Sequence, residues 1–291
     1  MAQLVQMRQR IKAIETIKKI THAMRLISMS THSRIRGKIP VLKYYNQEVS
    51  DLFDTIRATV PQWTNGIVSP EQEPGAKPLV ILIGSQKGLC GTFNTNLFKT
   101  FEKTTEELKF AKINIISVGK KAVDYLASRK KDRIVKEFPE ITVRNFTDVS
   151  QEIIAQILKA KTPYSSVRIV SNELKTFFVQ TPKVFDLLPL AKQNEKADTN
   201  TKKDESQESS EDYIWHQDKI ELLDNLANQY IAAQINTLLL ESLLAEQAAR
   251  FLSMDTANRN AKTLLEETTL QYNKLRQWKI TKELTELSTN F

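Results

Sequence analysis

The feature that most restricts the fold is the absence of helix-breaking residues from both ends of the chain. All seven glycines and all nine prolines of the 291 residues lie between Gly37 and Pro189, so residues 1–36 and 190–291 contain neither type. A β-sandwich or a β-barrel needs turn residues about every 8–12 positions. We therefore expect both ends of the chain to be helical and only the middle to be mixed.

The first end predicts one helix over residues 4–36 with an apolar stripe along one side. Its members recur at gaps of three and four, as in an amphipathic helix. They are Leu4, Met7, Ile11, Ile14, Ile17, Ile20, Met24 and Ile27. The repeated three-residue step around Ile17 would disturb a strict heptad. Gly37 and Pro40 predict a kink or short break, after which the helical pattern resumes to residue 60.

The other end predicts one very long helix over residues 213–287. Its expected seam residues are Leu226, Tyr230, Ala233, Thr237, Leu240, Leu244, Met254, Ala257, Ala261, Leu264 and Thr268. At 1.5 Å per residue such a helix is on the order of 110 Å long, so it must project from any globular domain of this size. A projecting apolar stripe needs a partner. We expect the two ends to pair as an antiparallel coiled coil.

The middle of the chain predicts an inserted α/β domain. Residues 61–77 are rich in proline and predict a linker. Apolar runs within residues 78–190 then alternate with helical patterns, which favours a mainly parallel sheet. Residues 191–212 contain no apolar side chain larger than alanine, which predicts a flexible polar loop. The expected domains are thus two coiled-coil segments, 1–60 and 213–291, around this α/β domain.

Positive charge is concentrated near the start of the chain. Residues 1–45 hold ten basic side chains and one acid, a net charge of +9, whereas the whole chain carries +8. Such a segment favours nucleic acid, anionic lipid or an acidic protein surface as partner. The segment has no aromatic residue before Tyr44, so base stacking has no support. A basic coiled-coil protein that binds nucleic acid remains the alternative hypothesis.

No motif in the sequence predicts catalysis, a cofactor or a metal. The loop at residues 84–91, GSQKGLCG, follows a predicted strand but matches neither GxxxxGK[ST] nor GxGxxG. It predicts a tight strand-to-helix turn. The three histidines, His22, His32 and His216, lack metal-ligand spacing. The single cysteine, Cys90, forms no internal disulfide, which favours a reducing compartment.

The sequence also predicts neither a membrane-spanning segment nor a signal peptide. Residues 1–10 are polar and lack the apolar core of a signal peptide. No run approaches the roughly 18 apolar residues that span a bilayer. We expect a protein that is soluble or peripherally bound to a membrane.

Four separated motifs resemble the gamma subunit of F-type ATP synthases, in order and over nearly the whole chain. Residues 10–24, RIKAIETIKKITHAM, resemble the N-terminal helix of that family. Residues 85–91, SQKGLCG, resemble its S-D-[KR]-G-L-C-G turn, with Gln86 in place of the usual acid. Two stretches near the other end, residues 246–261 and 272–287, resemble the signature and last turns of its C-terminal helix.

The resemblance implies a shaft without an active site of its own. The fold would be an antiparallel coiled coil of the terminal helices with an inserted Rossmann-like α/β domain. The shaft would couple ion-driven rotation of a membrane ring to conformational change in a catalytic ring. The implied partners are the alpha and beta subunits, the epsilon subunit and the c-ring, without nucleic acid, cofactor or self-association. The implied location is peripheral, on the cytoplasmic face of the bacterial inner membrane.

The resemblance also implies roles for particular residues. Positions that match contacts with the alpha/beta ring are Lys18, Lys19, Met24, Arg25, Arg276, Gln277 and Thr281. Gly88, Cys90 and Gly91 match a structural turn. Trp278 and Lys279 stand where the family usually has small residues, and so would change the fit at the tip of the shaft.

Overall fold

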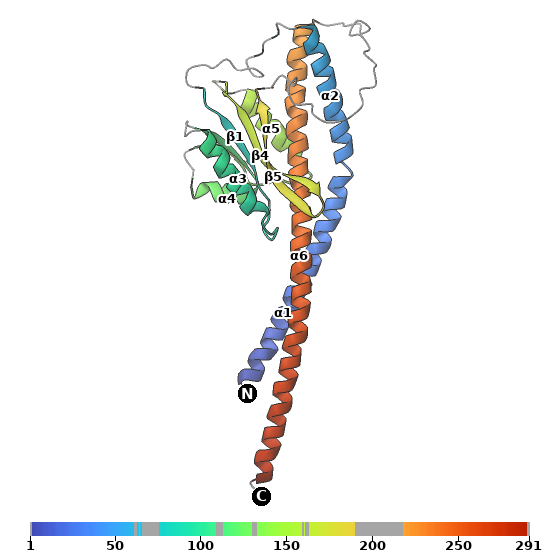
Figure 1. The fold of residues 1–291 in the computed structure, drawn as a ribbon, viewed down its shortest axis with the longest axis vertical. Helices are drawn as coiled ribbons and strands as arrows, with labels where there is room; N and C mark the ends of the chain where they lie inside the picture. The colour runs from blue at the N-terminus through green and yellow to red at the C-terminus, as the bar shows by residue number, and fades with distance from the viewer. Residues whose placement is uncertain are drawn as a thin grey trace. The chain divides into compact units, whose positions relative to one another are not determined.

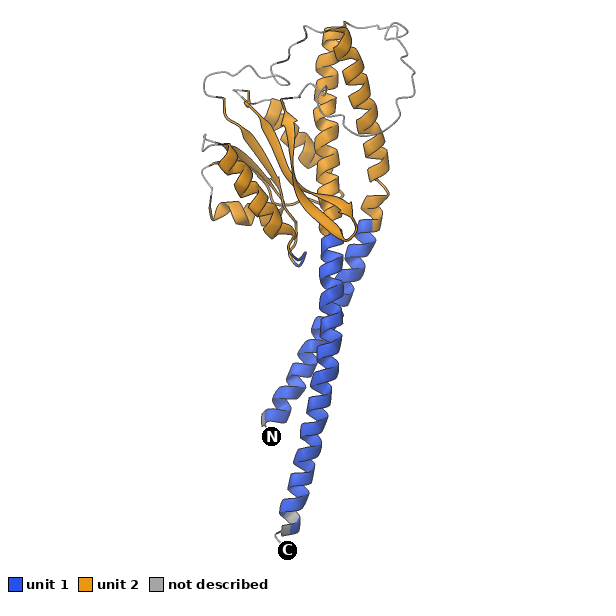
Figure 2. Cartoon of the chain, in the orientation of Figure 1, with its two compact units in different colours: residues 1–32, 89–91, 247–291 blue, residues 33–88, 92–246 orange. Residues whose placement is uncertain are grey.

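The computed structural model describes residues 2–60, 63, 65, 76–108, 113–129, 133–158, 160, 163–189 and 218–289. The predicted loop 191–212 and most of the predicted linker 61–77 lie outside these residues. The chain divides into two compact units (Figure 2). Unit 1 comprises residues 1–32, 89–91 and 247–291, and unit 2 comprises residues 33–88 and 92–246.

Three long helices are formed by the two ends of the chain (Figure 1). They are α1 (Ala2–Arg36), α2 (Ile39–Thr59) and α6 (Lys219–Thr289). The break predicted by Gly37 and Pro40 separates α1 from α2 as a two-residue turn. There the Lys38 N–H donates to the Ile35 carbonyl at 2.9 Å. Pro40 lies in the first turn of α2, where its missing N–H leaves no helical bond unmade.

In unit 1, α1 and α6 run antiparallel, and the buried side of α1 follows a strict alternation of three- and four-residue steps. Its buried or half-buried members are Leu4, Met7, Ile11, Ile14, Lys18, Thr21, Arg25, Ser28 and His32. The predicted stripe was therefore wrong at Ile17, Ile20 and Ile27, which are between 52% and 65% exposed, whereas its member Met24 is half-buried. A seam with a 3.5-residue period faces its partner only at heptad positions, whatever residue type occupies them.

The facing side of α6 in unit 1 keeps the same alternation. Its buried or half-buried members are Met254, Asn258, Ala261, Leu265, Thr268, Tyr272, Leu275 and Lys279. Met254, Ala261 and Thr268 were expected in the seam and lie there. Leu264 was also expected there but is 40% exposed, and its neighbour Leu265 takes the inward position.

Unit 2 contains a five-stranded sheet in the order β3-β2-β1-β4-β5. The strands are β1 (Leu79–Ile83), β2 (Asn114–Val118), β3 (Ile134–Phe138), β4 (Val167–Thr176) and β5 (Val179–Leu188). All neighbours pair in parallel except β4 and β5, which form an antiparallel hairpin. Strand β1 lies at the centre and is buried at every residue, as its continuous apolar run predicts.

Helices cover both faces of this sheet. Helices α3 (Phe93–Glu107) and α4 (Lys120–Ala127) pack on one face through a core that contains Val80, Leu97 and Leu126. Helix α5 (Phe146–Leu158) and the unit 2 part of α6 share the other core, which contains Ile81 and Ile235. The predicted fold class, a coiled coil of the terminal helices with an inserted α/β domain, is confirmed.

Strand β3 was not predicted. It lies at the edge of the sheet, and its three central residues are exposed. An edge strand with this exposure carries neither a continuous apolar run nor a clean alternation, so its sequence contains no strand signal.

Candidate functional site

The residues expected to contact a partner lie on α1 and α6 within unit 1. On α1, Lys19 is exposed, whereas Lys18, Met24 and Arg25 are half-buried. On α6 the three expected residues, Arg276, Gln277 and Thr281, are all exposed. The two groups lie far apart along the helix pair, because the antiparallel register places Arg25 opposite Asp255 and not near Arg276.

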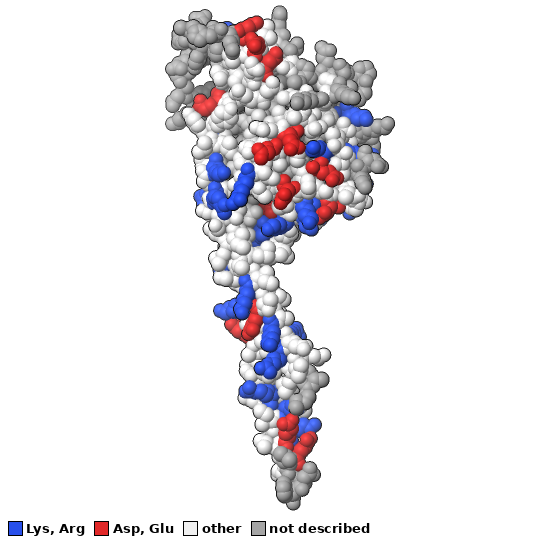
Figure 3. Space-filling view, turned by 180° about the vertical axis from the view of Figure 1, so that it is seen from behind, with Lys and Arg blue, Asp and Glu red and all other residues white. Residues whose placement is uncertain are grey.

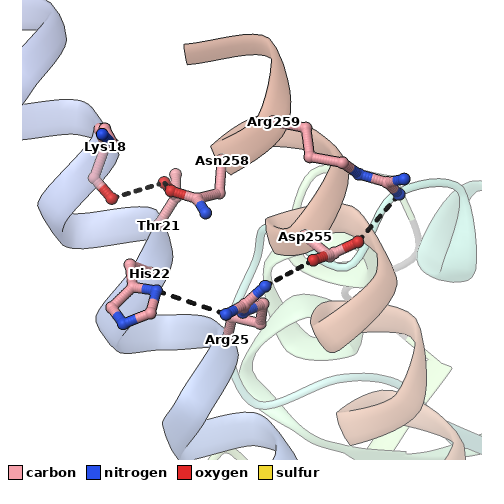
Figure 4. A network of polar contacts seen from close by, with 7 residues as sticks. All are labelled: Lys18, Thr21, His22, Arg25, Asp255, Asn258 and Arg259. Atoms are coloured by element: carbon pink, nitrogen blue, oxygen red, sulfur yellow. Dashed lines mark hydrogen bonds and ion pairs between the residues drawn. The ribbon is translucent and has the colours of Figure 1, made fainter. Parts of the chain in front are cut away.

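Arg25 already has a partner within the chain (Figure 4). Its Nη1 lies 2.7 Å from Asp255 Oδ1, and Arg259 Nη2 lies 2.8 Å from the other oxygen of the same carboxylate. The Arg25 hydrogen bond, with a smaller contribution from the Arg259 charge, holds the pKa of Asp255 below its usual value. His22 Nδ1 lies 3.4 Å from Arg25 Nη2. Arg25 therefore joins the two helices and also presents a partly exposed guanidinium.

One turn away, a second polar pair crosses the same seam. The Thr21 hydroxyl lies 3.5 Å from Asn258 Oδ1 and also approaches the Ile17 and Lys18 carbonyls at 3.0 and 3.1 Å. Polar groups that satisfy one another at heptad positions fix which residues face across a coiled coil. This polar layer explains why the seam passes through Thr21 while the larger Ile20 points outward.

Exposed apolar side chains accompany the basic ones on α1. They are Val5, Ile17, Ile20, Leu26, Ile27 and Met29. Figure 3 shows Lys and Arg side chains along the helices of unit 1 on the drawn face. Exposed apolar groups beside polar ones mark interaction surfaces. The sequence pattern assigned Ile17, Ile20 and Ile27 to the seam and so missed their exposure; an unbroken heptad register from Leu4 would have placed them outside the seam.

The end of α6 carries the residues that depart from the family pattern. Trp278 is 61% exposed, and Lys282 Nζ lies 5.5 Å from the centre of its ring. Trp278 and Lys279 line a shallow groove of about 250 Å³ together with Gln3, Leu4 and Leu275. The Thr281 hydroxyl donates to the Gln277 carbonyl at 3.0 Å, so its side chain is held against the helix.

The expected structural turn follows strand β1. Leu89 and Gly91 have positive φ angles of 63° and 60°, and Cys90 is buried. Leucine rarely adopts this conformation, so the surrounding chain must impose it. Glycine at position 91 meets the same requirement without a steric cost. The structural role of Gly88, Cys90 and Gly91 stays a prediction.

Within unit 2, the start of the same loop is tied to α6 by a contact that sequence reasoning missed. The Gln86 N–H donates to Glu246 Oε2 at 3.0 Å, and Gln86 Oε1 accepts from the Ile141 N–H at 3.1 Å. Glu246 is only 2% exposed. A buried carboxylate requires such donors. A single acid within residues 243–249, whose other members are Gln247 and apolar residues, was the available signal.

The described part of the chain contains no cluster of three or more histidine, cysteine or acidic side chains that could hold a metal ion. Among the same residues, no helix is both long enough and apolar enough to cross a bilayer. The arrangement of unit 1 is instead that of a stiff helix pair with a mixed apolar and basic exterior. Protein–protein interfaces likewise combine apolar and polar side chains.

Comparison with known proteins agrees with this arrangement. The family model described as ATP synthase matches residues 3–290. The ATP synthase gamma chain of Chlorobium limicola is 32% identical, with 99% of this chain and 97% of that protein covered. The ATP synthase gamma chain of Salinibacter ruber is also 32% identical, with the same coverage of both.

Solved structures share the fold at lower identity. A chain of the Euglena gracilis mitochondrial ATP synthase rotor has a TM-score of 0.63 at 16% identity, covering 96% of this chain and 99% of that one. A chain of the Tetrahymena thermophila mitochondrial ATP synthase central stalk and c-ring has a TM-score of 0.57 at 17% identity. That match covers 82% of this chain and 99% of the other. With the family model and the curated relatives both spanning nearly its full length, the chain belongs to the ATP synthase gamma chain family.

Proposed function

We propose that this chain is the central rotor shaft of an F-type ATP synthase. Its membership of the gamma chain family is the observation that carries this function. The chain is a non-catalytic subunit, and its partners are the alpha and beta subunits, the epsilon subunit and the c-ring. Rotation of the ring, driven by ions, turns the shaft and changes the conformation of the catalytic subunits.

The helix pair has the physical properties that this task needs. Three equivalent catalytic pockets around a ring cannot hold different conformations unless something asymmetric lies at the centre. A pair of different helices is asymmetric, and each orientation stabilises a different conformation of each pocket. Helices α1 and α6 have no glycine or proline in unit 1, so no helix-breaking residue weakens them against torque.

Two groups of residues are proposed to contact the alpha/beta ring. Lys18, Lys19, Met24 and Arg25 form the group on α1, and Arg276, Gln277 and Thr281 form the group on α6. The exposure of all three α6 residues supports the second group. The salt bridge between Arg25 and Asp255 leaves Arg25 only part of its hydrogen-bonding capacity for a partner. Partly solvated ion pairs between the shaft and the ring are weak enough to break and form again at every step of rotation.

The proposed location is peripheral, at the cytoplasmic face of a bacterial inner membrane. The curated relatives described above come from bacteria. Attachment to the membrane would be through the complex.

The test is purification of the tagged chain from its native membranes at moderate salt. We expect alpha and beta subunits to co-purify, and the eluate to hydrolyse ATP. Recovery of the chain with nucleic acid, or without alpha and beta subunits, would contradict the rotor function. A second measurement compares ATP hydrolysis with ATP-driven ion pumping in membrane vesicles that contain the complex. The ratio of pumping to hydrolysis measures coupling, so a change in a coupling subunit should alter this ratio.

A further inference from the structure

The turn between β4 and β5 consists of two phenylalanines. Thr176 pairs with Val179, so Phe177 and Phe178 alone connect the strands. Two-residue hairpin turns favour sequences such as Asn-Gly, because their central residues need positive φ. Neither phenylalanine has a positive φ, and the register shifts between Leu174 and Thr176 instead. Turn chemistry therefore does not explain these two residues, and such local exceptions concentrate at functional sites.

The turn is held in one conformation by its own side chains. Gln180 Nε2 donates to the Phe177 carbonyl at 2.7 Å. The rings of Phe177 and Phe178 pack edge to face, with centroids 5.5 Å apart. The hairpin also extends beyond the sheet, because β1 pairs with β4 only up to Val170. The result is a projecting turn with internal contacts, and a surface that is ordered before binding loses little conformational entropy.

The surface of this turn is apolar with a cation beside it. Phe178 is 74% exposed and Val179 is 47% exposed. Lys175 is exposed and forms no ion pair with any residue that the structure describes, whereas Lys183 lies 3.4 Å from Glu173. We call Lys175, Phe178 and Val179 the hairpin tip. An exposed aromatic anchor next to a cation is complementary to an apolar cleft with a carboxylate rim.

We propose that the hairpin tip docks into an apolar, acid-rimmed cleft on a single-copy protein subunit that turns with the shaft. In the assembly on which this inference rests, that subunit is epsilon. Apolar anchors suit an interface that stays formed, whereas contacts with the catalytic ring must be broken at every step. A single tip also requires a single socket, and a ring of identical c subunits would offer many equivalent sockets.

The direct test places a photoreactive residue at the tip in the complete complex. Phe178→p-benzoylphenylalanine is expected to form a crosslink to epsilon on irradiation. The control is the same residue at Val135, which is 42% exposed on β3 at the opposite edge of the sheet. No crosslink to epsilon is expected from position 135. A crosslink from position 178 to alpha, beta or c, equal crosslinking from both positions, or no crosslink would overturn the proposal.

A second test measures how firmly epsilon is retained. Phe178→Ser is expected to weaken epsilon retention in the washed complex by about tenfold, because it removes the apolar anchor. Phe178→Leu keeps an apolar side chain and should retain most of the epsilon. Lys175→Glu should also weaken retention, since it would repel the acidic rim. Because these side chains are exposed, thermal unfolding of the chain should not change.

The outcomes separate this inference from the proposed function. If the complex with Phe178→Ser contains alpha and beta, pumps ions and retains epsilon as well as the wild type does, that result would overturn the docking site alone. A chain that never assembles with alpha and beta would overturn the rotor function instead.

Discussion

At the scale of single residues, the charged contacts of unit 1 combine two tasks. Arg25 is one of the proposed ring contacts, yet its guanidinium lies against Asp255 of the facing helix. Asp255 receives a second arginine, Arg259, from its own helix. Substitution of Arg25 therefore alters the helix pair as well as any partner contact, and its effect on activity needs a stability measurement beside it.

The Asp255 carboxylate gives a pH-dependent prediction. Its pKa is lowered, chiefly by the hydrogen bond from Arg25, so its stabilising effect is full at neutral pH. That effect is lost as the pH falls below the ordinary carboxyl value of 3.8 and through the lower pKa of the folded state. Asp255→Asn should lower the melting temperature at neutral pH, and the difference from wild type should shrink in acid.

The measurement is thermal unfolding followed by circular dichroism, between neutral pH and about pH 3. Arg25→Gln supplies the matched control, because removal of either partner breaks the same contact. The double variant should then be little worse than either single variant. Additive losses, or a difference that does not depend on pH, would show that the ion pair does not stabilise the helix pair.

At the scale of elements, the loops of the α/β domain depend on close backbone approach. Gly119 precedes α4 with a φ of 88°, and a Cβ there would lie 2.3 Å from the Gly84 carbonyl oxygen. The Gly84 N–H in turn donates to the Val118 carbonyl at 2.8 Å. The ends of β1 and β2 are thus joined at a point where only glycine fits.

Gly119→Ala is expected to destabilise the chain by more than about 2 kcal/mol, since the strained φ and the backbone clash add together. Gly37→Ala is the control, because its φ is not positive and the nearest atoms, the Arg34 and Ser33 carbonyl oxygens, would lie 3.8 and 3.9 Å from the new Cβ. It should change stability by no more than about 1 kcal/mol. Chemical denaturation monitored by circular dichroism measures both; equal effects would contradict the steric argument.

A second element-level feature joins the start of α6 to the segment that follows α2. Asp224 Oδ1 accepts hydrogen bonds from Trp63 Nε1 at 3.1 Å and from Asn65 Nδ2 at 2.7 Å. Trp63 also packs edge-on against Phe53, whose ring lies 5.7 Å away. One carboxylate oxygen therefore accepts from both side chains, and Trp63 packs against an apolar cluster formed by the end of α2 and the start of α6.

Asp224→Ala is expected to cost about 1–3 kcal/mol, because it removes the shared acceptor of both donors. Asp224→Asn can keep one amide oxygen at the same place and should lose less. Chemical denaturation monitored by circular dichroism measures the stability of both variants. An alanine variant as stable as the asparagine variant would show that the two hydrogen bonds contribute nothing.

At the scale of the whole molecule, the chain is built to transmit a change of orientation and not to perform chemistry. Helix α6 continues for 71 residues and contributes to both compact units. Its last turns carry Arg276, Gln277, Trp278 and Thr281 on an exposed surface. Because these side chains contribute little to folding, changes there should alter coupling while leaving the isolated chain intact.

Truncation after Leu270 tests that expectation in the assembled complex. It removes Arg276, Gln277 and Thr281, and should lower ATP-driven ion pumping more than ATP hydrolysis. A substituted full-length chain, with alanine at those three positions, separates lost contacts from lost helix length. Unchanged pumping in both variants would contradict the proposed contact group.

Trp278→Ala tests the departure from the family pattern. Trp278 is mostly exposed, so the melting temperature of the isolated chain should change little. In the assembled complex the smaller side chain should change the hydrolysis rate, because it changes the fit at the tip. Leu284→Ala is a matched control, with 62% exposure on the same helix. Equal effects of the two substitutions would assign no special role to the tryptophan.

Local sequence was sufficient to predict the long helices, the break at Gly37 and the α/β character of the middle. Helix length follows from periodicity and from the absence of breakers, and both are properties of neighbouring residues. The motifs that indicate the family also follow from local sequence, and two of them meet in the contact between Gln86 and Glu246. The contact between these two motifs could not be predicted, because the loop and the helix position are far apart in the sequence.

The tertiary structure decided how the inward side of α1 continues beyond Ile14. Ile17, Ile20 and Ile27 look like seam residues, but the heptad register with α6 turns them outward. Strand β3 likewise exists because β2 offers it a free edge, and not because of its own sequence. In both cases the outcome depends on the partner element. A local pattern determines which secondary structure can form, whereas burial depends on what packs against it.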